Sequence, residues 1–316
     1  MSAGTPTPGP SGSMAVRAEP VEALAGTSTS SVRTAAPPSR GYWASTALRF
    51  VRDPVALFAL AVVLVLFTLA VFGPWLAPVD PTQSSMLSRL KPIGTEGHPL
   101  GTDELGRDML SRLMVGARLS LFMGITPVVL AFFIGSAIGI LAGYAGGVTN
   151  TVIMRTIDVF YAFPSVLLAI ALSGALGAGI GNALLSLTIV FIPPIARVAE
   201  SVTTQVRTRD YVEAARASGA AAFTIVRVHV LGNVLGPIFV YATSLIAVSM
   251  ILASGLSFLG LGVKPPEPEW GLMLNTLRTA IYVQPWVAAL PGVMIFITSI
   301  AFTLLSDSLR SAKDVK

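Results

Sequence analysis

Several residue types that build catalytic and cofactor sites are scarce in this 316-residue sequence. It contains no cysteine, which excludes disulfide bonds, a thiol nucleophile and cysteine-based metal sites. Its two histidines, His98 and His229, are far apart in the chain, which excludes a multi-histidine metal site. None of its four lysines follows a glycine, so the Gly-Lys-Ser/Thr ending of a phosphate-binding loop is absent. We therefore expect no cofactor, no metal and no ATP site of that kind.

Charged residues are also scarce. They make up 12% of the chain, against roughly 25% in soluble domains, whereas apolar residues make up 53% and the mean hydropathy is +0.75. This composition is typical of a helical protein that crosses a membrane several times. The net charge of +5 comes from scattered arginines rather than a basic run, so we expect no nucleic acid partner.

The first 45 residues differ from the rest of the chain. They are rich in Ser, Thr, Ala, Pro and Gly and contain no apolar run, so they are expected to form a disordered cytoplasmic tail. The missing apolar run also excludes a secretory signal peptide. Residues 46–316 are expected to form the membrane domain.

Six apolar stretches approach or reach the length of about 20 residues that a membrane span needs. They are Val55–Leu76, Leu119–Ala142, Phe160–Leu176, Leu184–Val202, Ile238–Leu259 and Val287–Leu305. The third is short unless its start lies nearer Ile153, and Pro193-Pro194 interrupts the fourth. The sequence thus predicts an all-α membrane protein with six transmembrane helices, which places both termini on one side.

The distribution of basic residues indicates which side is cytoplasmic. The loop after the fourth span, the flank before the first and the C-terminal tail share one side, and each has an excess of Arg and Lys. By the positive-inside rule this side is cytoplasmic. Residues 77–118 oppose this assignment, because they would be external and carry five basic residues. Trp270, Tyr282 and Trp286 of the other external loop are expected to form an interfacial aromatic belt.

The middle of each predicted span lacks ionisable residues, and Asp158 and Arg197 come close to span ends. Ion-coupled carriers usually hold ionisable groups at mid-depth, so this pattern argues against a self-powered carrier. Gly135, Gly139 and Gly143 are four residues apart and share one helix face. Such faces mostly pack against another helix, and we expect close packing here rather than a pore lining.

A short polar segment between the fourth and fifth spans carries its own helix signals. Asp210 can cap the first turn, and Glu213 falls at the third helical position of a capping box. Gly219 can take the left-handed conformation that ends a helix. About two turns of helix are predicted outside the lipid, where they need a partner or a surface to lie on. We expect one face to dock, and its residues are Tyr211, Val212, Ala215 and Ser218.

This segment resembles the EAA loop of permeases from binding-protein-dependent ABC importers. The resemblance rests on Glu213-Ala214-Ala215, followed by Gly219 and Leu231, within a loop of about residues 203–236. His229 and Gly232 stand where the family pattern has isoleucine and proline. The end of the second helix of the loop is therefore altered relative to the family.

Three further stretches resemble the dipeptide, oligopeptide and nickel permeases in particular. They are residues 98–108 before the second span, residues 258–271 after the fifth, and Asp307 with Leu309-Arg310 near the C-terminus, where Ser306 replaces a family glycine. In this order they resemble the C-type subunit, and the resemblance runs from about residue 45 to the end of the chain.

The resemblance implies a transport subunit with the type I importer permease fold, not an enzyme, in a bacterial inner membrane. It implies a B-type permease, ATP-binding ABC subunits and an extracytoplasmic substrate-binding protein as partners. The short helix would be a coupling helix held in a groove of the ATPase subunit. The residues implied in this coupling are Asp210, Tyr211, Glu213, Ala214, Ala215, Arg216 and Gly219. The cargo stays open among dipeptides, oligopeptides, nickel complexes, glutathione and other solutes.

Three smaller predictions concern polar residues elsewhere. Thr102–Gly116 is expected to form an interfacial helix at the headgroups, in which Asp108 and Arg112 form an i,i+4 pair. Arg155 and Asp158 are expected to pair on one helix face. His98 is expected to be an ordinary loop residue.

Two other classes of function are weighed against the ABC permease. A self-contained secondary carrier or channel would transport solute as the isolated chain. An intramembrane enzyme would need paired carboxylates or a serine with a base at depth, and the predicted spans do not offer them.

Overall fold

Helices dominate residues 50–314, the part of the chain that the computed structural model describes. The expected disordered tail, residues 1–45, lies outside these residues. Two isolated bridges join Thr95 to His98 and Thr102 to Asp108. The main helices are α2 Pro54–Leu76, α3 Met109–Ala145, α4 Gly147–Tyr161, α5 Ser165–Leu176, α6 Ile180–Arg207, α7 Asp210–Ala217, α8 Ala222–Ile225, α9 Leu231–Phe258, α10 Trp270–Thr276 and α11 Pro285–Asp314.

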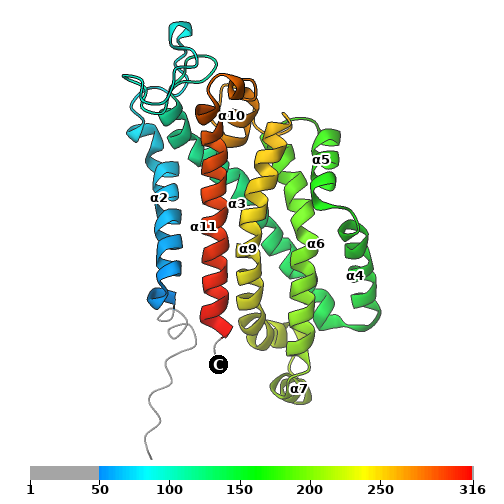
Figure 1. The fold of residues 1–316 in the computed structure, drawn as a ribbon. Helices are drawn as coiled ribbons and strands as arrows, with labels where there is room; N and C mark the ends of the chain where they lie inside the picture. The colour runs from blue at the N-terminus through cyan, green and yellow to red at the C-terminus, as the bar shows by residue number, and fades with distance from the viewer. Residues whose placement is uncertain (1–49, 315–316) are drawn as a thin grey trace, which may run out of the picture. The chain divides into compact units, whose positions relative to one another are not determined.

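Within residues 50–314, five helices are long and apolar enough to cross a membrane: α2, α3, α6, α11 and the helix Ala222–Phe258 that contains α8 and α9. The pair α4 and α5 supplies a sixth passage if it is counted as one bent span. Successive passages run in opposite directions, so α7, the start of α2 and the end of α11 lie at one end of the bundle (Figure 1). The loop before α3 and the helix α10 lie at the opposite end. We call these the α7 end and the α10 end.

Two spans have other boundaries than the sequence predicted. Helix α3 begins at Met109 because Asp108 caps it, and it is therefore longer than Leu119–Ala142. Helix α6 runs through Pro193 and Pro194 without a break, so the predicted interruption is wrong. A proline removes one main-chain donor, and packing of neighbouring helices compensates for this in membrane proteins.

The third span is broken rather than short, and it starts earlier than Phe160. Helix α4 begins at Gly147, and α5 follows at an angle of 85°. The break falls at Pro164, whose ψ of 124° is not helical. Proline also disfavours helical geometry at the preceding residue, which here is Phe163, and this explains the position of the bend.

The glycine face of α3 packs against α6, as the spacing predicted. A Cβ atom at Gly139 would lie 2.3 Å from the carbonyl oxygen of Ala196, and one at Gly143 would lie 2.7 Å from that of Glu200. A Cβ atom at Gly135 would approach the carbonyl oxygen of Ile192 to 3.0 Å. Main chain thus packs against main chain along the helix pair, which stabilises their contact through dispersion.

One apolar cluster joins α2, α3, α9, α10 and α11. Trp270 belongs to it and is fully buried, and its indole N–H donates to the carbonyl oxygen of Leu113 at 3.0 Å. The prediction that Trp270 belongs to an interfacial belt is therefore wrong, because Gly116 leaves room for its ring against α3. Tyr282 and Trp286 are exposed.

Candidate functional site

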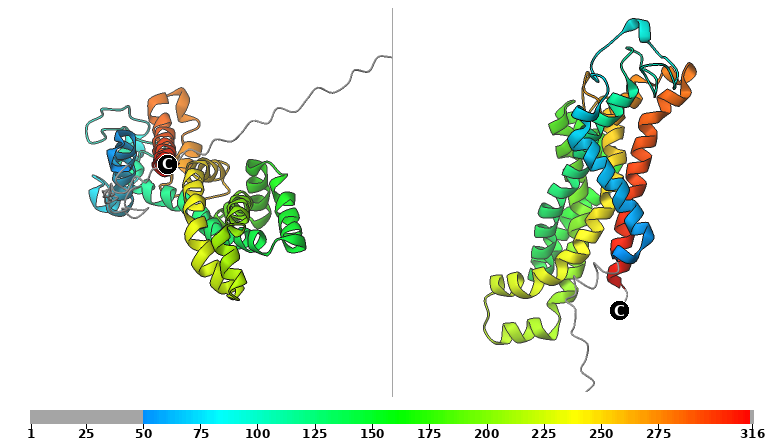
Figure 2. Two further views of the ribbon diagram at one scale, coloured as in Figure 1. Left: turned by 90° about the horizontal axis from the view of Figure 1, so that it is seen from below. Right: turned by 90° about the vertical axis from the view of Figure 1, so that its left-hand side faces the viewer.

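The loop between α6 and α9 forms a surface at the α7 end of the bundle. Helix α6 ends at Arg207, and α7 begins at Asp210, so Thr208 and Arg209 alone connect them. Helix α7 lies across the long helices and projects beyond their ends (Figure 2). A connection this short fixes the position of α7 relative to α6.

The start of α7 differs from the predicted capping box. Arg209 is the N-cap, and no side chain caps this end. The carbonyl oxygen of Arg209 accepts from the N–H groups of Val212 and Glu213 at 2.9 and 3.1 Å. Asp210 and Glu213 are one position further into the helix than a capping box requires, because the chain leaves α6 so abruptly. Both still lie in the first turn, where the helix dipole favours negative charge.

The end of α7 follows the prediction. Gly219 has a φ of +82°, the left-handed conformation that glycine adopts without strain. The N–H of Gly219 donates to the carbonyl oxygen of Arg216 at 3.0 Å, and that of Ala220 donates to Ala215 at 3.1 Å. This pair of bonds is the Schellman motif, so α7 is stopped by its own sequence.

One side of α7 faces the protein. Val212 is fully buried and belongs to a cluster with Ile225, Val230 and Val234. Ala215 is half-buried against the same cluster. The predicted docking face, which included Val212 and Ala215, is therefore wrong in these two positions. Their role is to hold α7 against the start of the next passage.

The opposite side of α7 is not buried against an apolar cluster. Its exposed residues are Asp210, Tyr211, Glu213, Ala214, Arg216 and Ala217. Phe223 on α8 adds an apolar side chain that is 76% exposed, and the ring centroids of Tyr211 and His229 are 6.2 Å apart. Phe223 was missed in the sequence, because its neighbours Ala221, Ala222 and Ile225 are also apolar and nothing sets it apart.

Polar contacts tie this end of α6 to α3 and α4. The Arg207 guanidinium donates to the carbonyl oxygens of Gly143 and Tyr144, both at 3.2 Å. About two helical turns earlier, Glu200 accepts from the side-chain amide of Asn150 at 2.7 Å. Because these bonds join three helices, α7 is attached to a braced group and not to one free helix end.

Asp158 and Arg155 pair as predicted, with 3.7 Å between Nη1 and Oδ2. Asp158 also pairs with Arg197, which the sequence did not indicate because 39 residues separate them. Since α6 continues to Arg207, Arg197 lies ten residues inside its end rather than close to it.

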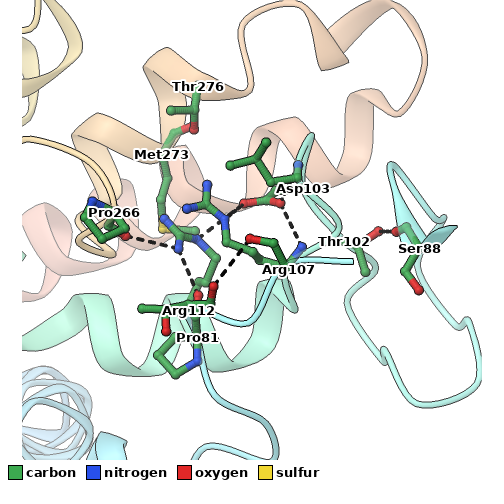
Figure 3. A network of polar contacts seen from close by, with 12 residues as sticks. Pro81, Ser88, Thr102, Asp103, Arg107, Arg112, Pro266, Met273 and Thr276 are labelled. Atoms are coloured by element: carbon green, nitrogen blue, oxygen red, sulfur yellow. Dashed lines mark hydrogen bonds and ion pairs between the residues drawn. The ribbon is translucent and has the colours of Figure 1, made fainter. Parts of the chain in front are cut away.

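The α10 end holds a buried ionic network (Figure 3). Asp103 accepts from Nε of Arg107 at 2.6 Å and lies 3.5 Å from Nε of Arg112. Arg112 also donates to the carbonyl oxygens of Pro81 and Pro266, at 2.9 and 3.4 Å. All three ionic side chains are almost completely buried. The network fastens the loop before α3 and the loop before α10 to the top of α3.

This network corrects three predictions. The predicted interfacial helix Thr102–Gly116 does not form, because α3 starts at Met109. Asp108 does not pair with Arg112 and instead caps α3 by accepting from the N–H and Oγ of Ser111, both at 2.8 Å. His98 is not an ordinary loop residue, since its Nδ1 lies 3.0 Å from Asp108.

Glu269 is a third buried carboxylate at this end, after Asp103 and Asp108. It caps α10 by accepting from the N–H groups of Gly271 and Leu272 at 2.9 and 2.8 Å. Burial nevertheless raises the pKa of Glu269 above its usual value, because desolvation outweighs these bonds. The α10 end is thus a cap that contains several buried ionic groups.

Comparison with known proteins identifies the family to which this architecture belongs. Residues 135–314, more than half of the chain, match the family model described as binding-protein-dependent transport system inner membrane component. Residues 41–92 match the N-terminal TM domain of oligopeptide transport permease C.

Named relatives and solved structures agree with these matches. The chain is 42% identical over 286 residues to the glutathione transport system permease protein GsiD of Pectobacterium atrosepticum, covering 90% of this chain and 93% of that protein. It is 40% identical over 284 residues to the di/tripeptide transport system permease protein DppC of Pseudomonas aeruginosa, covering 88% and 92%. The inward-facing MetNI methionine ABC transporter matches in fold, with a TM-score of 0.53 and 20% identity over 65% of this chain and 97% of that chain. The chain therefore belongs to the family of binding-protein-dependent transport system inner membrane components and is the multi-pass permease subunit of an ABC importer.

Proposed function

We propose that this permease couples ATP hydrolysis in a separate subunit to transport through the exposed face of α7. The observation that carries the proposal is the two-sidedness of that helix: Val212 fixes one side to the bundle, and the other side is left uncovered. The contact residues are Asp210, Tyr211, Glu213, Ala214 and Arg216, with Phe223 beside them. Gly219 contributes by ending the helix. Ala215 has a packing role instead.

The chain needs partners for this work, because its sequence lacks a phosphate-binding loop. The partners are ATP-binding ABC subunits, a B-type permease that completes the path, and an extracytoplasmic protein that delivers the cargo. The α7 end then faces the cytoplasm of a bacterial inner membrane, with both termini on that side. The basic excess of the loop after α6 supports this orientation.

The cargo we propose is a short peptide or a peptide-like solute such as glutathione. Support comes from the names of the relatives, which are glutathione and di/tripeptide permeases of 40–42% identity over most of their length.

The coupling surface is tested by reversing or removing its exposed side chains. Tyr211→Ala and Glu213→Lys should lower co-purification of the ATPase subunit and substrate-stimulated ATP hydrolysis by tenfold or more, as truncation at central interface positions does (about 1–4 kcal/mol). Arg89→Glu, an exposed site in the loop at the α10 end, is the matched control. Tyr211→Ala leaves the acidic first turn of α7 unchanged, so a loss in that variant cannot be ascribed to the helix dipole. Normal assembly and coupling in both variants would refute the proposed surface.

The need for partners is tested by reconstitution. Liposomes holding the complete complex should take up dialanine or glutathione only with ATP and the binding protein present. Uptake by the isolated chain would instead establish the self-contained carrier or channel.

A further inference from the structure

The Asp158–Arg197 pair is an unusual feature of the membrane passages. Arg197 of α6 donates through Nη2 to Oδ1 of Asp158 on α4. The pair is not sealed inside the bundle, because the side chains are 50% and 35% exposed. It therefore lies on a surface that lipid, a partner subunit or the transported solute must cover.

The position of the pair along the helix makes its charge significant. Arg197 lies within the passage formed by α6, and Asp158 lies on α4 close to the break in the α4–α5 passage. Ionisable side chains inside membrane passages are costly and typically mark the path of a solute or ion.

A cavity lies at the break between α4 and α5, and it reaches the pair through Tyr161. It has a volume of about 300 Å³, and its lining includes Tyr161, Phe163, Ser165 and Tyr241, together with Pro193 of α6. The Arg197 guanidinium carbon lies 5.5 Å from the centroid of the Tyr161 ring. Tyr161 thus joins the two features, since one of its sides lines the cavity and its ring contacts the cation.

We propose that this pair and cavity form a contact site for zwitterionic cargo inside the membrane, in which Arg197 binds the cargo carboxylate and Asp158 binds its ammonium group. The inference rests on the proposed peptide cargo. Each protein charge exchanges one partner of opposite sign for another, so neither is left unpaired in the empty or the occupied state. This avoids the large penalty of an isolated charge at depth. The aromatic lining accommodates the rest of a small peptide.

The first test is transport by the complete complex in liposomes, with dialanine and its C-terminal amide as cargo. Arg197→Gln should lower dialanine uptake by about tenfold or more, the range for loss of a charged hydrogen bond, and should change uptake of the amide far less. Arg155→Gln is the control, since Arg155 also pairs with Asp158 and is 81% exposed; it should leave uptake of both near the wild-type rate. The same binding protein delivers cargo to every variant, so a changed ratio arises in the membrane.

A charge exchange separates cargo contact from mere bracing. The double variant Asp158→Arg with Arg197→Asp keeps an ion pair between α4 and α6. If the pair only braces these helices, uptake should recover to the wild-type level, and that recovery would overturn the inference. Continued loss in a complex that assembles and hydrolyses ATP normally is the expected result.

Binding of cargo in the cavity is tested directly by whether the cargo protects a thiol there from alkylation, and this measurement does not need the binding protein. The chain has no cysteine, so Ser165→Cys gives this chain one thiol, in the cavity lining. Millimolar dialanine should slow its alkylation in the purified complex, and Arg197→Gln should abolish the protection; unaltered alkylation would refute the site. If the wild-type complex takes up neither dialanine nor glutathione, the proposed peptide cargo is wrong. If the wild-type complex takes them up and Arg197→Gln does not alter the uptake, the cargo stands and the proposed contact site is wrong.

Discussion

Replacement of Gly139 by alanine is the sharpest test of how α3 and α6 are held together. The added Cβ atom would lie 2.3 Å from the carbonyl oxygen of Ala196, 2.6 Å from Cβ of Ala199 and 2.9 Å from the amide nitrogen of Glu200. Two of these three atoms are main chain, so no side-chain rotation relieves the clash. The helices must separate by roughly 1 Å to restore ordinary contact distances.

The expected change in stability of Gly139→Ala is the sum of two opposing effects. Overpacking a tight interior costs about 1–3 kcal/mol, and the upper end applies here because separation also loosens the contacts at Gly135 and Gly143. Alanine has a higher helix propensity than glycine by roughly 1 kcal/mol, which offsets part of the cost. A net destabilisation of about 2 kcal/mol is expected for Gly139→Ala.

The assay is the midpoint of thermal unfolding of the purified complex. Gly139→Ala should lower it by several degrees. The control is Gly255→Ala in α9, where a Cβ atom meets nothing within 4 Å and the propensity gain acts alone. A midpoint for Gly139→Ala equal to or above that of the control would show that the glycine face does not hold the two helices.

Three further predictions concern the ends of the bundle. Asp103→Asn leaves the buried Arg107 and Arg112 without their counter-charge and should destabilise the complex by about 3–5 kcal/mol, seen as a large fall in its unfolding midpoint; an unchanged midpoint would contradict the network. The raised pKa of Glu269 means that the folded state binds its proton more tightly than the unfolded state, so stability is greatest below the ordinary value of 4.5 and should fall as pH rises through the raised pKa. Glu269→Gln should flatten that slope, and persistence of the slope would assign it to other groups. Arg207→Met removes the bonds between α6 and the carbonyl groups of α3, and it should lower transported solute per ATP hydrolysed while the ATPase subunit still co-purifies; an unchanged ratio would show that the brace carries no force.

Local signals in the sequence predicted the features that local chemistry determines. Long apolar runs predicted the membrane passages, because a helix needs about 20 mostly apolar residues to cross the hydrocarbon core. Gly219 predicted the end of α7, since few other residues take a left-handed conformation without strain. The spacing of Gly135, Gly139 and Gly143 predicted a packing face, although it did not identify α6 as the partner.

Features that depend on distant residues were missed or misread. Asp210 looked like an N-cap, but the cap falls at Arg209 because α6 ends only two residues earlier. Trp270 looked interfacial, but Gly116 on a distant helix makes room for it. The Asp158–Arg197 pair joins residues 39 positions apart, and short-range patterns carry no information about such a contact.

Helix α6 connects the surfaces discussed above, and its continuity matters for any mechanism that works through α7. It carries Arg197 in its middle part, Arg207 at its end and α7 two residues later. Its other face follows the glycines of α3 at main-chain contact distance. A packed interface of this kind shifts between discrete arrangements rather than deforming smoothly. A force applied at α7 would therefore move α6 and α3 together, and Arg197 would move relative to any α4 residue that does not follow. The start of α4 follows α6 through the bond between Asn150 and Glu200, so the ion pair opens only if the end of α4 that carries Asp158 does not follow.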